Sequence, residues 1–151
     1  MRNKATGEIE LLNAKTGDET SFDADRNVDP QRYEVLGVFH THPFDAADDN
    51  YSSVPHSFSD GDFAAFIQHG DRLDIVRSGT REFMLGRTDA TPGKAKESMY
   101  GEYQQRLQDN LARTSDGDFE EGLRMAAAEM AAKYGIAYYE NESGAFVKVK
   151  P

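Results

Sequence analysis

The stretch Gly37-Val38-Phe39-His40-Thr41-His42-Pro43 joins a short apolar segment to two histidines and a proline. Short apolar runs bounded in this way are typical of buried strands, and a proline cannot continue a ladder as a donor. Because successive side chains of a strand alternate between its faces, His40 and His42 leave the same face. The stretch therefore predicts a strand, from Tyr33 to His42, that ends by presenting two imidazoles to one point.

A second stretch, Ser59-Asp60-Gly61-Asp62, stands before an apolar run and has the character of a helix start. Ser59 is suited to cap the helix, and the carboxylate of Asp62 falls in its first turn. Imidazole and carboxylate groups are zinc ligands, and three protein ligands leave a fourth position open, as catalytic sites do. We therefore predict that His40, His42 and Asp62 bind Zn²⁺. Each of the two motifs has an ordinary explanation when it occurs alone, since His-x-His pairs are common and Ser-x-x-Asp is a frequent helix cap.

The combination His-x-His-Pro and Ser-x-x-Asp resembles the signature of the JAMM/MPN+ (JAB-type) zinc metallopeptidases, which cleave peptide or isopeptide bonds. The resemblance covers about residues 5–90. It implies that a metal-activated water hydrolyses an amide bond of a protein or peptide substrate, and that Ser59 helps to stabilise the oxyanion. The segment 44–58 is longer than its counterpart in the family. We expect it to form a flap beside the site, with His56 as a spare ligand.

The family also uses a glutamate that precedes an early strand and holds the attacking water. Glu8 and Glu10 are the candidates, in an expected strand from Thr6 to Asn13, and they are equally well explained as surface residues of that strand. A further possibility is that the glutamate precedes Met1, because JAB-type domains occur at the C-termini of large bacterial toxin proteins and this chain has the look of such a fragment. A non-catalytic JAB-fold module that binds another protein is the alternative function.

The remaining pattern predicts an α/β domain over residues 1–151, with a mixed, mostly antiparallel sheet flanked by helices. Its C-terminal part reads as a helical pair followed by a hairpin, and the whole agrees with a JAB/MPN-like fold. The expected strands are 72–77, 82–86, 136–139 and 145–149, and the expected helices are 60–68, 95–112 and 118–134.

The composition of the chain limits the classes of ligand and partner that it can bind. The chain has 17 Lys and Arg against 27 Asp and Glu, a net charge of −10, which disfavours nucleic acid. It has no cysteine, so histidine and carboxylate are the strong zinc ligands that remain. No signal peptide and no membrane-spanning stretch is visible. We expect a cytoplasmic protein or one delivered as part of a secreted effector, with a larger parent polypeptide or an inhibitor protein as further partners.

Overall fold

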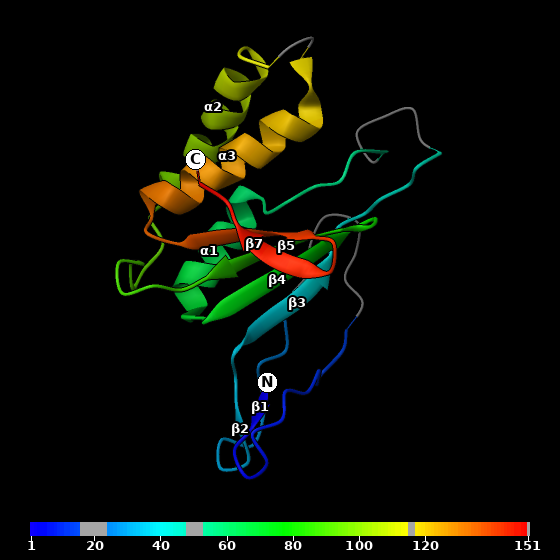
Figure 1. The fold of residues 1–151 in the computed structure, drawn as a ribbon. Coiled ribbons are helices and arrows are strands. Elements are labelled where there is room, and N and C mark those ends of the chain that lie inside the picture. Colours follow the sequence, from blue (N-terminus) through cyan, green and yellow to red (C-terminus); the bar gives the residue numbers. More distant parts are fainter. Residues whose placement is uncertain (16–23, 48–52, 115–116, 151) are drawn as a thin grey trace.

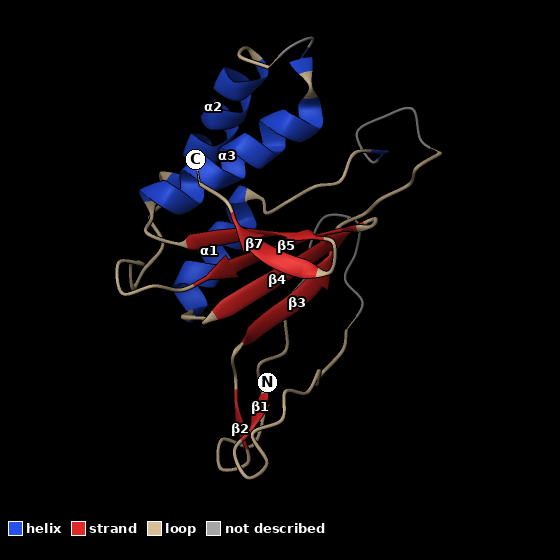
Figure 2. Cartoon of the chain, in the orientation of Figure 1, coloured by secondary structure: helices blue, strands red, loops and turns tan. Residues whose placement is uncertain are grey.

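The computed structural model describes residues 1–15, 24–47, 53–114 and 117–150 of the 151-residue chain. A five-stranded sheet and three helices form its main body, and a small two-stranded unit lies beyond one edge (Figures 1 and 2). The sheet strands are β3 (Gly37–Thr41), β4 (Leu73–Ser78), β5 (Arg81–Gly86), β6 (Ala137–Glu142) and β7 (Ala145–Lys148). The helices are α1 (Asp60–His69), α2 (Met99–Leu111) and α3 (Phe119–Lys133), and the small unit pairs β1 (Arg2–Asn3) with β2 (Tyr33–Glu34).

The strands of the sheet follow the order β3-β4-β5-β6-β7. The β3–β4 pair is parallel, with α1 in the connection between its strands, and the other pairs are antiparallel. The expected mixed, mostly antiparallel α/β architecture is confirmed. Gly37 opens β3 where its backbone meets Leu73 so closely that a Cβ atom there would lie 1.6 Å from the Leu73 carbonyl oxygen. Only glycine permits that approach.

A row of register partners crosses four strands of the sheet. His40 lies opposite Val76, Val76 opposite Phe83, and Phe83 opposite Glu140. Directly opposite residues point to the same face. Val76 and Phe83 are buried in the hydrophobic core, so His40 and Glu140 emerge on the core side of the sheet.

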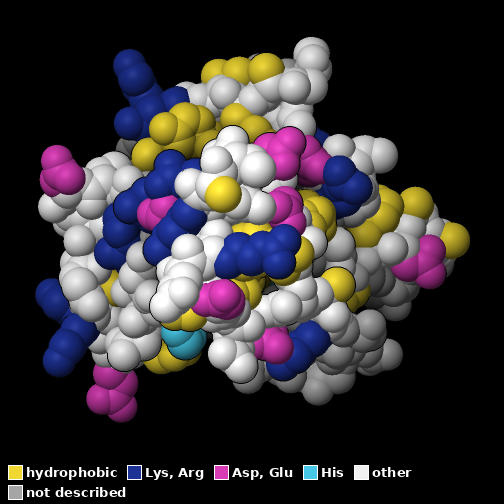
Figure 3. Space-filling model, turned by 90° about the horizontal axis from the view of Figure 1, so that it is seen from below, with side chains coloured by type: hydrophobic (Ala, Val, Ile, Leu, Met, Phe, Trp, Pro, Cys, Tyr) yellow, Lys and Arg dark blue, Asp and Glu magenta, His cyan; other side chains and the backbone are white. Residues whose placement is uncertain are grey.

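The helices complete the core on that side. α3 packs on β6 and α2, and α2 packs on α1 (Figure 1). From α1, Phe63, Phe66 and Ile67 are fully buried, and side chains of this kind contribute about 1.5–3 kcal/mol each when removed from water. This packing holds the first turn of α1 against the sheet. Figure 3 shows one outer face of the molecule, on which acidic and basic side chains are interspersed.

Both ends of α1 follow the sequence prediction. Ser59 caps the helix with extended backbone, and its side chain accepts from the Asp62 N–H while the Asp62 carboxylate accepts from the Ser59 N–H. The helix ends at Gly70, which has a φ of 73° in the left-handed region. A capping box of this kind fixes the carboxylate at the third helical position as well as the helix start.

The expected strand from Thr6 to Asn13 is wrong. These residues make a turn and an open segment, with a single bridge between Ile9 and Arg2. The side-chain oxygen of Asn3 accepts from the N–H groups of Ala5 and Thr6, which favours the turn. Alternating apolar residues form a strand only where a face can be buried, and here Ile9 is 66% exposed.

Other boundaries also differ from the prediction. The expected strand from Tyr33 to His42 is divided between β2 and β3, which belong to separate sheets. The helix expected over 95–112 begins only at Met99. The expected flap 44–58 includes residues 48–52, which lie outside the described residues. Its last part is held on the core, since Ser57 and Phe58 are buried. Within the described ranges, no helix combines the length and apolar character needed to cross a bilayer.

Candidate metal centre

The structure brings His40, His42 and Asp62 together where the end of β3 meets the start of α1. The Nε2 atoms of the two histidines are 3.3 Å apart. Asp62 places Oδ1 3.4 Å from Nε2 of His40 and Oδ2 3.3 Å from Nε2 of His42. Among the described residues this is the one group of three or more His, Cys, Asp or Glu whose ligand atoms converge, all within 4.8 Å.

The separation of the two Nε2 atoms fits zinc, and Asp62 meets each of them with a different carboxylate oxygen. In a tetrahedral site with ligand bonds of about 2.0–2.1 Å, donor atoms stand about 3.3 Å apart. The side chain of His40 is 9% exposed, whereas those of His42 and Asp62 are 19% and 21% exposed. The group is therefore anchored on the core side at His40 and reaches solvent at His42 and Asp62. A nitrogen–nitrogen–oxygen donor set with one open side suits a catalytic site better than a closed structural site.

Ser59 positions the acidic ligand. Oδ2 of Asp62 accepts from the Ser59 N–H at 2.7 Å and from the Ser59 hydroxyl at 2.8 Å. The hydroxyl in turn accepts from the Asp62 N–H at 3.2 Å. Its single proton is thus directed at the carboxylate in this arrangement. These helix-cap bonds leave Oδ1 of Asp62 free for His40, whereas Oδ2 also lies beside His42.

Asp74 stands behind His40 and was missed by the sequence analysis. It lies on β4 with 4% exposure, and its Oδ1 is 3.3 Å from Nδ1 of His40. Histidines that bind metal commonly direct the other ring nitrogen at a carboxylate, which fixes the ring and its tautomer. A signal was present in the sequence, because Asp74 occupies the alternation phase of Val76 and Ser78, both of which face the core.

Electrostatics in the metal-free site couple these groups. Burial alone lowers the pKa of His40, but the adjacent carboxylates of Asp62 and Asp74 outweigh it and raise that pKa to about 10. Burial alone raises the pKa of Asp62, but His40 and His42 hold it well below its usual range. For Asp74 burial dominates and raises the pKa, with His40 opposing it. In the metal-free site Asp62 is therefore ionised and His40 is protonated, so a metal ion must displace the His40 proton in order to bind.

The other candidates lie elsewhere. The carboxylate of Glu8 accepts from the Thr6 hydroxyl at 3.2 Å, and that of Glu10 accepts from the Asn3 side chain at 3.1 Å. Both belong to the unit around β1 and β2, below the sheet in Figure 1, and neither joins the converging ligand atoms. His56 packs its ring against Phe119, with 6.1 Å between ring centroids, and is also outside the ligand group.

Comparison with known proteins gives no independent assignment. No family model, no curated protein and no solved structure matches the chain.

Proposed function

We propose that this protein is a zinc-dependent metallopeptidase or isopeptidase of the JAMM (JAB) type, acting on a protein or peptide. The observation that carries the proposal is the convergence of His40, His42 and Asp62, in which the two Nε2 atoms are one tetrahedral edge apart and each lies within 3.4 Å of an oxygen of the Asp62 carboxylate. The motif that resembles the JAMM family supplies these three residues in a strand-end and helix-start context. A JAB/MPN-like assignment of the α/β fold is part of the same proposal.

Each residue has a defined task in this proposal. His40 and His42 bind the ion as neutral imidazoles, and Asp62 adds one negative charge. Asp74, whose Oδ1 is 3.3 Å from Nδ1 of His40, would accept the remaining ring proton and keep Nε2 free for the metal. Zinc bound here would supply Lewis-acid chemistry, activating water and polarising an amide carbonyl. Ser59 holds Asp62 and would stabilise an oxyanion only by turning its hydroxyl proton away from that carboxylate.

One observation favours a second function, that of a non-catalytic JAB-fold module that binds another protein. Amide hydrolysis at a metal site needs a general base near the activated water. Glu8 and Glu10 are engaged with Thr6 and Asn3 in the N-terminal unit. Without another carboxylate to take the proton, the site would hold zinc and bind protein without turnover.

The test measures zinc content and turnover of peptide and isopeptide substrates by the same preparations. The unmodified chain, His42→Ala and His69→Ala form the main series, the last being a matched histidine at the exposed end of α1. The enzyme hypothesis expects about one zinc and metal-dependent turnover, both retained in His69→Ala and lost in His42→Ala. Zinc without turnover favours the binding module. Absence of zinc from the unmodified chain overturns the enzyme hypothesis and leaves only a metal-free form of the binding module.

A further inference from the structure

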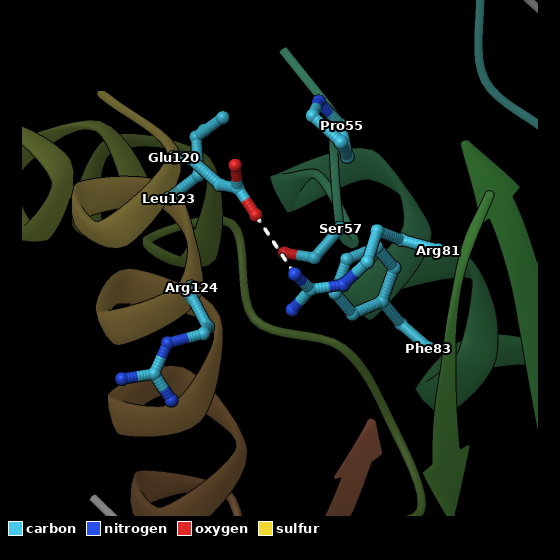
Figure 4. Close-up of a pocket in the computed structure, with 7 residues that line it drawn as sticks. All are labelled: Pro55, Ser57, Arg81, Phe83, Glu120, Leu123 and Arg124. Carbon is cyan, nitrogen blue, oxygen red and sulfur yellow. Dashed lines mark hydrogen bonds and ion pairs between the residues drawn. The ribbon is translucent and has the colours of Figure 1, made fainter. Parts of the chain in front are cut away.

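A shallow pocket lies where the start of α3 faces the start of β5 (Figure 4). α3 contributes Glu120, Leu123 and Arg124, and β5 contributes Arg81 and Phe83. The segment that leads to α1 closes it with Pro55 and Ser57. The charged groups of the lining are two guanidinium groups and one carboxylate.

The guanidinium of Arg81 is positioned in this pocket by three contacts. Its guanidinium lies over the Phe83 ring, 5.8 Å from the centroid, and one nitrogen is 3.4 Å from the buried carboxylate of Glu140. The other nitrogen is 3.0 Å from the carboxylate of Glu120, as the dashed line in Figure 4 marks. Glu120 is 43% exposed, and ion pairs between exposed groups contribute little to stability. The carboxylate on the outer side of Arg81 is therefore easily exchanged for another.

A buried hydroxyl faces the same place. Ser57 is 4% exposed and lines the pocket, and in the described parts of the chain its Oγ atom has only the neighbouring Tyr138 hydroxyl to interact with, outside ordinary hydrogen-bond geometry. Behind it, the Tyr138 hydroxyl neighbours Ser57 and Glu140, and Oε1 of Glu140 is 3.7 Å from the Arg124 guanidinium, so these buried oxygens are only loosely satisfied. Buried polar atoms without partners are rare in native proteins, and they mark places where a hydrogen-bonding group is expected. A hydroxyl and a guanidinium that converge in one pocket are donors matched to a carboxylate.

We propose that this pocket binds a carboxylate group of a ligand, which takes the place of the Glu120 carboxylate on Arg81 and accepts from the Ser57 hydroxyl. The space is filled at present, so the Glu120 side chain must turn out to solvent, and the ligand carboxylate must reach deeper than that of Glu120, which leaves the Ser57 hydroxyl without a bond. The ion pair with the buried carboxylate of Glu140 keeps the Arg81 guanidinium in place when the Glu120 side chain turns away.

The pocket is linked to the metal centre. Ser57 and Ser59 are separated only by Phe58, which is fully buried and packs against the His40 ring at 6.2 Å between centroids. Arg81 precedes Phe83 by two residues on β5 and so shares the face that His40 occupies on β3. Two strand spacings and the two-residue offset along β5 amount to about 12 Å, the length of between three and four residues of extended peptide. The pocket thus fits a subsite for an acidic residue of the substrate, a role that rests on the proposed function.

Binding is tested on the full chain stripped of metal, because a bound zinc ion would itself attract carboxylates. The probe is an N-acetylated, C-terminally amidated Ala-Glu-Ala peptide, compared with its Ala-Gln-Ala counterpart and with an Ala-Ala-Ala peptide that has a free C-terminus. Amide chemical shifts are followed by NMR. The glutamate peptide should shift the amides of Ser57, Arg81 and Glu120, and the glutamine peptide should not. Response to the free C-terminus would identify the main-chain carboxylate as a source.

The variants separate a binding site from a structural ion pair. Glu120→Gln removes the competing charge and should tighten binding by about 2–5-fold. Arg81→Gln should weaken it by about tenfold or more, and Arg81→Lys by less. Arg113→Gln, in an ion pair with Glu129 on the helical pair, is the matched control and should change nothing. Equal shifts by the glutamate and glutamine peptides, or unchanged affinity in both Glu120→Gln and Arg81→Gln, would overturn the proposal.

A second arm measures turnover by the zinc-loaded chain. A preference for glutamate peptides that Arg81→Gln abolishes, with zinc content unchanged, establishes the subsite role. Binding that follows the expected pattern without any turnover would leave the carboxylate site in place and count against the enzyme hypothesis alone.

Discussion

The ligand group of the candidate metal centre and the N-terminal strand were both predicted from alternating residues, and only the first set of side chains lies where the alternation places it. His40 lies on β3 and His42 directly follows it, and β3 is fixed by β4 on one side and supported from the core by Phe58 and Phe63, both fully buried. Ile9 and Leu11 alternate in the same way, but they are 66% and 82% exposed. Alternation fixes side chains in space only where a packing surface fixes the strand.

The largest expected effect separates these two regions by zinc content. His42→Ala removes one of three converging ligands and should abolish stoichiometric zinc, measured by elemental analysis after dialysis. Glu8→Gln and Glu10→Gln should leave zinc content unchanged, because both side chains are engaged in the N-terminal unit. Zinc retained by His42→Ala, or lost from Glu10→Gln, would reverse the assignment of the two regions.

A smaller effect is expected at the carboxylate behind His40. Asp74→Asn keeps the size of the side chain but removes the charge that orients the ring, so zinc affinity should fall about 10–100-fold. Competition with a fluorescent chelator measures this. Glu140→Gln is the matched control, since Glu140 is equally buried on the same face but lies away from His40. Equal losses in both variants would mean that general destabilisation, and not orientation of His40, is the cause.

The pH dependence of zinc binding should follow from the protonation of His40. Its pKa is raised to about 10 in the metal-free protein, so zinc must displace a proton at every pH below that value. The apparent affinity should therefore rise about tenfold per pH unit between pH 6 and 8. The pKa of Asp62 is lowered, so that carboxylate stays ionised and adds no slope. A flat profile across this range would show that His40 is already neutral.

The charged groups of His40 and Asp62 also contribute to the stability of the metal-free fold. The raised pKa of His40 gives a contribution that is present in full below its ordinary value of 6.5 and is lost as the pH rises through about 10. The lowered pKa of Asp62 gives one that is present above 3.8 and is lost as the pH falls. Both stabilising contributions are present at mildly acidic pH, where the metal-free site is therefore most stable. Zinc binds less tightly there than at pH 8, because the His40 proton is harder to displace.

The sequence was informative where short-range chemistry decides the structure. The capping box at Ser59 and Asp62, the end of α1 at Gly70 and the same-face pair of histidines all depend on neighbours within a few residues. The contact of Asp74 with His40 depends instead on the register between β3 and β4, which no local pattern specifies. The convergence of Arg81 and Ser57 likewise requires three distant segments to meet.

Whether Glu8 or Glu10 lies near the ligand group was beyond the sequence for a related reason. Glu8 and Glu10 fit a strand as well as they fit a loop, because the alternation around them is short. The loop is favoured over the strand by the turn that Asn3 stabilises and because no surface is available on which Ile9 could be buried. Neither influence can be weighed without the tertiary structure.

The smallest expected effect concerns Ser59, whose hydroxyl both accepts from the Asp62 N–H and donates to the Asp62 carboxylate. Ser59→Ala removes the helix cap and should cost about 1 kcal/mol in the free energy of unfolding, measured by denaturant titration. The Ser59 N–H still donates to Asp62 in this variant, so zinc affinity should fall by less than in Asp74→Asn. Ser59→Thr retains a hydroxyl and serves as the matched control. If turnover instead falls by about 10²–10³ while stability and zinc binding remain near normal, the hydroxyl acts as an oxyanion donor and its contact with Asp62 is secondary.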